Sequence, residues 1–135
     1  MTYLLDVNAL LALGYALHVH HDRAEAWIAQ LQTSGIPSLA TCAITELGFV
    51  RVASGAVAHS VDVATAKLEL AQLKQSSVVS FQFLKDELGA DRLPAWVTKS
   101  GQTTDGHLVA LAVAHGAKLA TFDADIADPA VLVIP

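Results

Sequence analysis

Four acidic residues stand at the edges of apolar segments, and they are the residues of this sequence best suited to shared chemistry. They are Asp6, Glu46, Asp105 and Asp123. A carboxylate beside a buried element loses hydration and needs a partner. One such residue is explained as a helix cap, but four of them in a small domain indicate that they share a cation.

The cation that suits such a set is a hard divalent metal. Clustered carboxylates raise one another's pKa, and a bound cation removes that repulsion. Mg²⁺ and Mn²⁺ prefer oxygen ligands, whereas a set that needs no Cys or His argues against zinc. A bound metal makes water a better nucleophile and stabilises charge on a phosphoryl group. The chemistry indicated is metal-assisted hydrolysis of a phosphodiester.

Each acidic residue also has a structural interpretation. Asp6 is placed to cap the helix that follows it, and Asp105 at a helix N-terminus is favoured by the helix dipole. Asp123 fits an ordinary turn. Glu46 is the hardest to explain in this way, because its neighbours along the helix are mostly apolar. The combination, more than any single residue, favours a functional site.

The segments around these residues predict alternating strands and helices. Five short apolar segments are expected to be strands: Tyr3–Asp6, Pro37–Thr41, Val78–Phe81, Lys118–Thr121 and Val131–Ile134. Five segments with helical periodicity are expected at about Ala9–Leu17, Asp22–Ser34, Ala43–Ala53, Asp62–Gln75 and Asp105–His115. Asp22 with Glu25 has capping-box spacing, and Gly116 is a natural helix stop. Lys85–Gly101 is irregular, with one short helix expected near Pro94–Val97.

Strands separated by helices, with continuous apolar runs, predict an α/β protein with a mainly parallel sheet. Sites in such sheets lie outside the carboxyl ends of the strands. Asp6, Glu46 and Asp123 reach that edge by topology, and Asp105 is placed there by hypothesis. The length of 135 residues, without a linker or a repeat, predicts one domain spanning residues 1–135.

Composition narrows the class of protein. The formal charge of −5 argues against a large basic nucleic-acid surface, unless part of the negative charge is gathered at a metal site. No apolar stretch reaches the roughly 18 residues of a membrane helix. Cys42 is the only cysteine, which excludes an internal disulfide and fits a reducing, cytoplasmic setting.

Four motifs, in their order along the chain, resemble those of the PIN-domain ribonucleases, most closely the VapC toxins of bacterial toxin–antitoxin pairs. Each motif is weak alone, but the ordered set is fairly specific and covers essentially the whole chain. The matching segments are Leu4–Leu11, Thr45–Arg51, Thr103–Ala112 and Leu119–Asp123.

The resemblance implies a three-layer α/β/α fold and a Mg²⁺ or Mn²⁺ site. By position, Asp6, Glu46 and Asp105 match the principal metal carboxylates of the family, and Asp123 matches the fourth acid. Two further residues match supporting positions: Asn8 beside the first acid and Thr121 as a hydroxyl next to the site. Asp125 is a second candidate, placed to substitute for or assist Asp123. Ala124 stands where such toxins often carry a basic residue.

The resemblance also implies an RNA substrate, a cognate VapB-type antitoxin and commonly a homodimer. Cutting RNA would inhibit translation and growth. Such antitoxins usually insert a segment across the acidic cleft, often with an Arg that pairs with the carboxylates. RNA is favoured over DNA because this small chain lacks the extra modules that structure-specific DNA nucleases usually need.

Several other polar residues have both a functional and a structural interpretation. Arg51, Arg92 and Lys99 are candidates for a substrate rim, and Trp96 either stacks on an RNA base or is buried. His18, His20 and His21 lie in a loop that is poorly spaced for a metal site, so we expect structural roles for them. His107 is expected at the rim or in packing contacts, because it is two positions from Asp105 and points to another helix face.

Two other classes of function remain open at this stage. One is a phosphoaspartyl protein, either a phosphatase or a receiver domain, with Asp6 as the nucleophile. Asn8 stands where that phosphatase pattern wants a second Asp, and a receiver would lack its paired acids. The other is a non-catalytic interaction domain, which would be expected to lose carboxylates that this chain retains.

Overall fold

The computed structural model describes residues 1–55 and 61–135. It alternates short parallel strands with helices, as the sequence predicts. The strands are β1 (Thr2–Leu5), β2 (Ser38–Cys42), β3 (Ser80–Leu84), β4 (Lys118–Thr121) and β5 (Val131–Val133). The α-helices are α1 (Val7–Gly14), α2 (His21–Gln32), α3 (Ala43–Ala53), α4 (Val63–Lys74) and α5 (Thr103–Ala114). Two short 3-10 helices, η1 (Ala90–Arg92) and η2 (Ser100–Gln102), precede α5.

The five strands form one sheet in the order β3-β2-β1-β4-β5, and every pairing is parallel. The chain builds outward from β1 to β2 and β3, then crosses back to place β4 on the other side of β1. The strand order therefore reverses between β1 and β4, where Leu5 pairs with Ala120. In open α/β sheets this switch point is where ligand sites form, outside the carboxyl ends of the strands.

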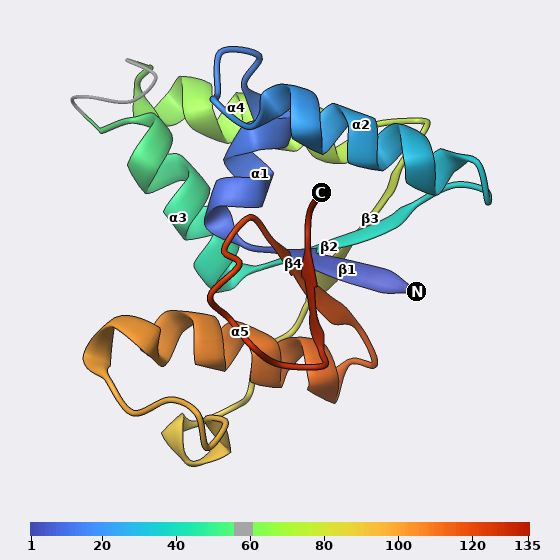
Figure 1. The fold of residues 1–135 in the computed structure, drawn as a ribbon. Coiled ribbons are helices and arrows are strands. Elements are labelled where there is room, and N and C mark those ends of the chain that lie inside the picture. The colour runs from blue at the N-terminus through green and yellow to red at the C-terminus, as the bar shows by residue number, and fades with distance from the viewer. Residues whose placement is uncertain (56–60) are drawn as a thin grey trace.

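Helices cover both faces of the sheet, which confirms the three-layer α/β/α architecture. Figure 1 shows α1, α2 and α4 on one side of the sheet and α5 on the other. Successive strand residues serve opposite faces: Leu5 packs with the α1–α4 side, and Leu4 packs with Leu108 and Leu111 of α5. Both faces of the central strands are therefore buried, which explains their continuous apolar sequence.

The structure corrects the start of two helices. The first helix was expected over Ala9–Leu17, but α1 begins at Val7, because the Asp6 side chain accepts a hydrogen bond from the Ala9 amide. The predicted capping box at Asp22 and Glu25 is wrong. Helix α2 begins at His21, with His20 as its N-cap and no side-chain capping bond. A turn in which His21 N donates to the His18 carbonyl at 3.0 Å brings the chain into the helix early.

Two further segments differ from the sequence-based expectation, and the end of the last helix agrees with it. The third strand is Ser80–Leu84, shifted from Val78–Phe81, because pairing of Ser38 with Ser80 fixes its register against β2. The short helix expected near Pro94–Val97 is a turn, flanked by η1 and η2. Gly116 ends α5 with φ +67°, as predicted from its position after the helix. Within the described ranges, no helix has the length and apolarity required to cross a membrane.

Candidate active site at the carboxyl edge of the sheet

Asp6 and Asp123 lie at the ends of the two strands that flank the switch point. Asp6 follows β1 directly, and its amide donates to the Ala120 carbonyl of β4 at 3.2 Å. Asp123 comes two residues after β4 ends at Thr121. Because β1 and β4 are neighbouring parallel strands, their carboxyl ends bring both aspartates to the same edge of the sheet.

Asp6 is the most buried of the acidic residues, with 9% of its surface exposed. Its Oδ1 accepts the Ala9 amide at 2.7 Å, and the Thr121 hydroxyl donates to the same carboxyl. Burial nevertheless raises the pKa of Asp6 above its usual value, and the charges of Asp105 and Asp123 raise it further. Asp6 therefore caps α1, as predicted, and also lies within electrostatic range of Asp105 and Asp123.

Asp105 lies in the first turn of α5 and is half-buried. Burial raises its pKa, and the charge of Asp123 adds to that shift. A tight contact holds this end of α5 in place: a Cβ on Gly106 would lie 2.2 Å from Val97 Cγ2. The fold thus brings Asp105, which the sequence placed at this edge only by hypothesis, within electrostatic range of Asp6 and Asp123.

Asp123 is exposed and belongs to a turn that the β4 end organises. Its amide donates to Thr121 Oγ1 at 3.0 Å, and its Oδ1 accepts the Asp125 amide at 2.9 Å. Thr121 is fully buried and so links the turn to Asp6. Asp125 contributes its backbone to this turn, and its side chain is exposed.

Glu46 makes its close contacts elsewhere. Its Oε2 accepts the Thr41 hydroxyl at 2.5 Å and lies 2.6 Å from the Lys74 ammonium. Helix α3, which carries Glu46, is brought against the start of α1 by Gly48, where an added Cβ would lie 2.4 Å from Val7 Cγ2. Glu46 is half-buried, and its carboxylate is paired with the Lys74 ammonium.

The acidic residues form an electrostatic cluster rather than a closed ligand set. Among the residues that the structure describes, no three His, Cys, Asp or Glu side chains are grouped as they would be around a metal ion. The donor chemistry still fits a hard cation, because all of the groups are carboxylates and their charges oppose one another's ionisation. Burial is the main cause of the raised pKa values of Asp6 and Asp105, and a divalent cation would remove the further contribution from repulsion between the acids.

The other predicted residues are exposed and come from separate elements. Asn8 is exposed, and its Oδ1 lies 2.8 Å from His18 Nε2. Arg51 is exposed in the last turn of α3. Arg92 ends η1 and Lys99 precedes η2, and both are exposed in the segment that packs against α5.

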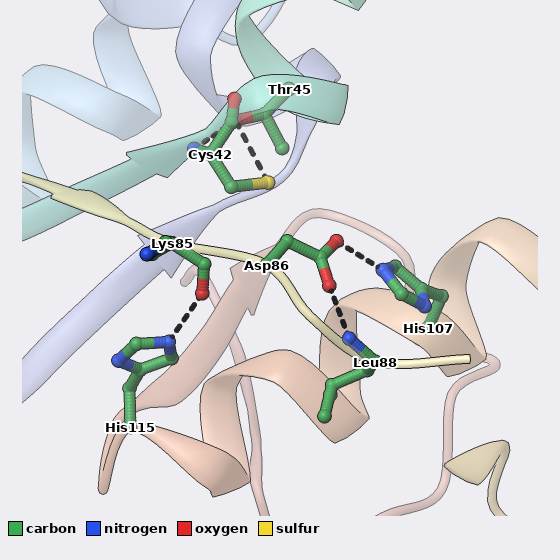
Figure 2. Close-up of polar contacts among 7 residues, drawn as sticks. All are labelled: Cys42, Thr45, Lys85, Asp86, Leu88, His107 and His115. Carbon is green, nitrogen blue, oxygen red and sulfur yellow. Dashed lines mark hydrogen bonds and ion pairs between the residues drawn. The ribbon is translucent and has the colours of Figure 1, made fainter.

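Side chains with competing interpretations have structural contacts. Trp96 is half-buried, packs against the α5-side core, and donates through Nε1 to Asp128 Oδ2 at 2.8 Å. His21 Nδ1 lies 2.7 Å from the Ala12 carbonyl, which ties α2 to α1. Cys42 is fully buried, and its Sγ lies 3.7 Å from Thr45 Oγ1 (Figure 2). Cys42 is therefore part of the core.

Three polar contacts were not predicted from the sequence. Two of them join Glu46 to Lys74, 28 residues away, and to Thr41 in β2, and no local pattern marks either contact. Asp86 was also missed: its Oδ2 lies 2.5 Å from His107 Nε2, and its Oδ1 accepts the Leu88 amide.

The His107 contact ties Asp86 to α5, whereas the Leu88 amide bond holds Asp86 within its own turn. Figure 2 shows Asp86 between His107 and Leu88, with His115 directed at the Lys85 carbonyl. His107 lies in α5 and His115 is its C-cap, so two points along this helix are joined to Lys85 and Asp86. The only sequence signal for this was the pair of polar histidines on an otherwise apolar helix.

Comparison with known proteins gives consistent matches over nearly the whole chain. A PIN-domain family model matches residues 3–132. Ribonuclease VapC39 of Mycobacterium tuberculosis is 40% identical over 135 residues, covering 96% of this chain and 94% of the relative. Ribonuclease VapC44 of the same organism is 43% identical over 139 residues, covering 97% and 92%. Ribonuclease VapC38 is 39% identical over 127 residues, covering 91% and 86%.

Proposed function

This chain belongs to the PIN-domain family, and on that premise we propose that it is an endoribonuclease, the toxin of a VapBC-type toxin–antitoxin pair. It hydrolyses RNA phosphodiester bonds and so inhibits translation and growth. The observation that carries the proposal is the mutual electrostatic effect of Asp6, Asp105 and Asp123 at the switch point of the sheet. The family match favours this hydrolase over the phosphoaspartyl alternative.

We further propose that Asp6, Glu46, Asp105 and Asp123 hold the metal on which PIN-domain ribonucleases in general depend. Mg²⁺ or Mn²⁺ bound there would activate water and stabilise charge on the phosphate. Thr121 and the Ala9 amide fix the orientation of the Asp6 carboxyl, and the first turn of α5 directs Asp105 to the same edge. The turn at Asp123 lets Asp125 assist.

The residues around the carboxylates are proposed to support and contact the substrate. Asn8, in the first turn of α1, is proposed to support the site, and its side chain contacts His18. Arg51, Arg92 and Lys99 are exposed cations and are proposed to meet RNA phosphates at the rim. At the rim, these positive charges would offset part of the net charge of −5 that the chain carries.

We also propose a partner, a location and a domain organisation for this toxin. The proposed partner is a VapB-type antitoxin, as the VapC names of the relatives suggest. We also propose that the toxin forms a homodimer. We place the activity in the cytoplasm, where its RNA substrate is found. Residues 1–135 act as one nuclease domain, which the family match over residues 3–132 and the single continuous sheet support.

The test is cleavage of a mixed panel of tRNA and rRNA fragments by purified, antitoxin-free protein. We expect cutting with Mg²⁺ or Mn²⁺, none with EDTA, and a loss in Asp6→Asn larger than the roughly 10–100-fold typical of outer-shell changes. Glu87→Gln is the matched control, because that carboxylate is 77% exposed and pairs only loosely with Lys85 at 3.4 Å. Activity that survives both EDTA and Asp6→Asn would refute the carboxylate–metal mechanism. A folded protein that cuts no RNA of the panel would favour the non-catalytic interaction domain.

A further inference from the structure

The Glu46–Lys74 ion pair joins a proposed metal ligand to a cation that belongs to the chain itself. Lys74 is the last residue of α4, and its Nζ lies 2.6 Å from Glu46 Oε2. The two side chains are 28% and 22% exposed. This is a short, charge-assisted contact between partly buried groups, unlike the loose surface pair of Lys85 and Glu87 at 3.4 Å.

Each member of the ion pair has a second contact. Thr41 donates its hydroxyl to the same oxygen, Glu46 Oε2, that receives the Lys74 ammonium. The Lys74 Nζ also lies 5.7 Å from the centroid of the Phe83 ring, within the range of a cation–π contact. A groove of about 410 Å³ between α3 and α4 surrounds the pair, and Lys67 lines it as well.

We propose that Lys74 is an internal counter-cation that competes with divalent metal for Glu46. The inference rests on the proposed function, because it assigns Glu46 to the metal site. In the metal-free protein Lys74 pairs with Glu46, and among the described residues neither Asp6 nor Asp105 forms an ion pair with a Lys or Arg. Oε2 already accepts the Thr41 hydroxyl and the Lys74 ammonium, which occupy its two lone pairs, so a metal at Oε2 must displace one of them. Repulsion between the two cations makes the ammonium the group that leaves.

The magnitude of the competition follows from the exposure of the pair. Because more than a fifth of each side chain reaches solvent, the ammonium can regain hydration on a flexible stem when it leaves. A partly exposed ion pair of this kind therefore opposes metal binding by only a modest free energy. We expect its removal to tighten metal binding about 3- to 10-fold. Lys74 therefore sets the metal concentration at which the site fills.

The experiment is a Mn²⁺ titration of the purified protein, with free Mn²⁺ measured by its electron paramagnetic resonance signal. Wild type, Lys74→Met, Lys74→Arg and Lys67→Met are compared, and far-UV circular dichroism checks folding. We expect Lys74→Met to bind about 3- to 10-fold more tightly than wild type, and Lys74→Arg to remain near wild type. Lys67→Met is the matched control, because Lys67 lines the same groove and is not the partner of Glu46.

A double-mutant cycle ties the effect to the pair. In a Glu46→Gln background the carboxylate is gone, so Lys74→Met should no longer change the Mn²⁺ affinity. An unchanged or weaker affinity in Lys74→Met overturns the inference, and so does an equal gain in Lys67→Met. Asp6→Asn separates the two proposals: Mn²⁺ binding that is lost in Asp6→Asn but insensitive to Lys74 refutes this inference alone. Absence of Mn²⁺ binding in every variant refutes the metal site itself.

A second measurement follows Lys74 directly and does not depend on a variant folding. Amine acetylation read by mass spectrometry reports how accessible each lysine is. We expect added Mg²⁺ to increase the labelling of Lys74 and to leave that of Lys67 unchanged. Labelling of Lys74 that does not respond to Mg²⁺, in protein shown to bind the metal, would overturn the counter-cation role.

Discussion

Gly48 controls how closely α3 approaches α1, and replacing it with Ala tests whether that approach positions the site. A Cβ at this position would lie 2.4 Å from Val7 Cγ2, whereas ordinary contact begins at 3.4 Å, so about 1 Å of separation must be found. Val7 opens α1, and a valine in a helix has essentially one rotamer, so the backbone has to move. Glu46 and Asp6 are close neighbours of these two residues in sequence, so they move with them.

The expected cost combines two opposing effects. Overpacking costs about 1–3 kcal/mol, and about 2–3 kcal/mol is expected here because the 2.4 Å approach is to a side chain with essentially one rotamer. Ala gains about 1 kcal/mol over Gly in a helix interior. The net loss of about 1–2 kcal/mol lowers Tm by roughly 3–10 °C for a chain of this size. If the site lies where we propose, a displacement of about 1 Å also lowers RNA cleavage by about 100-fold.

The assay is urea unfolding followed by the fluorescence of the buried Trp27, with cleavage measured in parallel. Val7→Ala combined with Gly48→Ala should recover both stability and activity, because it frees the space that the new methyl group needs. Gly101→Ala is the control, since a Cβ there meets nothing within 4 Å. A Gly48→Ala protein as stable as wild type, or single effects that simply add in the double variant, would refute the reasoning.

Three other predictions concern the polar contacts. Burial and the neighbouring acids raise the pKa of Asp6, so its ionisation costs stability as the pH rises from 3.8 through the raised pKa. Asp6→Asn, which can still accept the Ala9 amide, should therefore unfold at a higher temperature at pH 7, and the gain should vanish below pH 3.8. Burial raises the pKa of Asp86, but the hydrogen bonds from His107 and the Leu88 amide, together with the charges of His107 and His115, outweigh it and the pKa is lowered. Asp86→Ala should lose about 1–2 kcal/mol at pH 7 in urea unfolding, and less as the pH falls below 3.8 through the lowered pKa. Trp96→Phe should lose about 1 kcal/mol by the same measurement, because Asp128 loses its donor; no loss would mean that the bond contributes nothing.

Local patterns were enough to predict the elements that carry the acids. Helix α3 begins and ends where its apolar periodicity and the residues Ser54 and Gly55 indicate, and β4 matches the expected strand at both ends. These segments depend on hydrogen bonds and caps within a few residues, so sequence alone decides them. The start of α2 was wrong because contacts of His18 and His20 compete with the capping box that Asp22 offers.

The sequence by itself determined that this is a mainly parallel α/β protein with carboxylates after its first and fourth strands. Only the tertiary structure decided that β1 and β4 are neighbours, which brings Asp6 and Asp123 together, and that Lys74 neutralises Glu46. Strand order and long-range pairs arise from packing between segments that are far apart in the chain. No local pattern encodes such contacts, because they depend on the register of the sheet and on how closely two helices can approach.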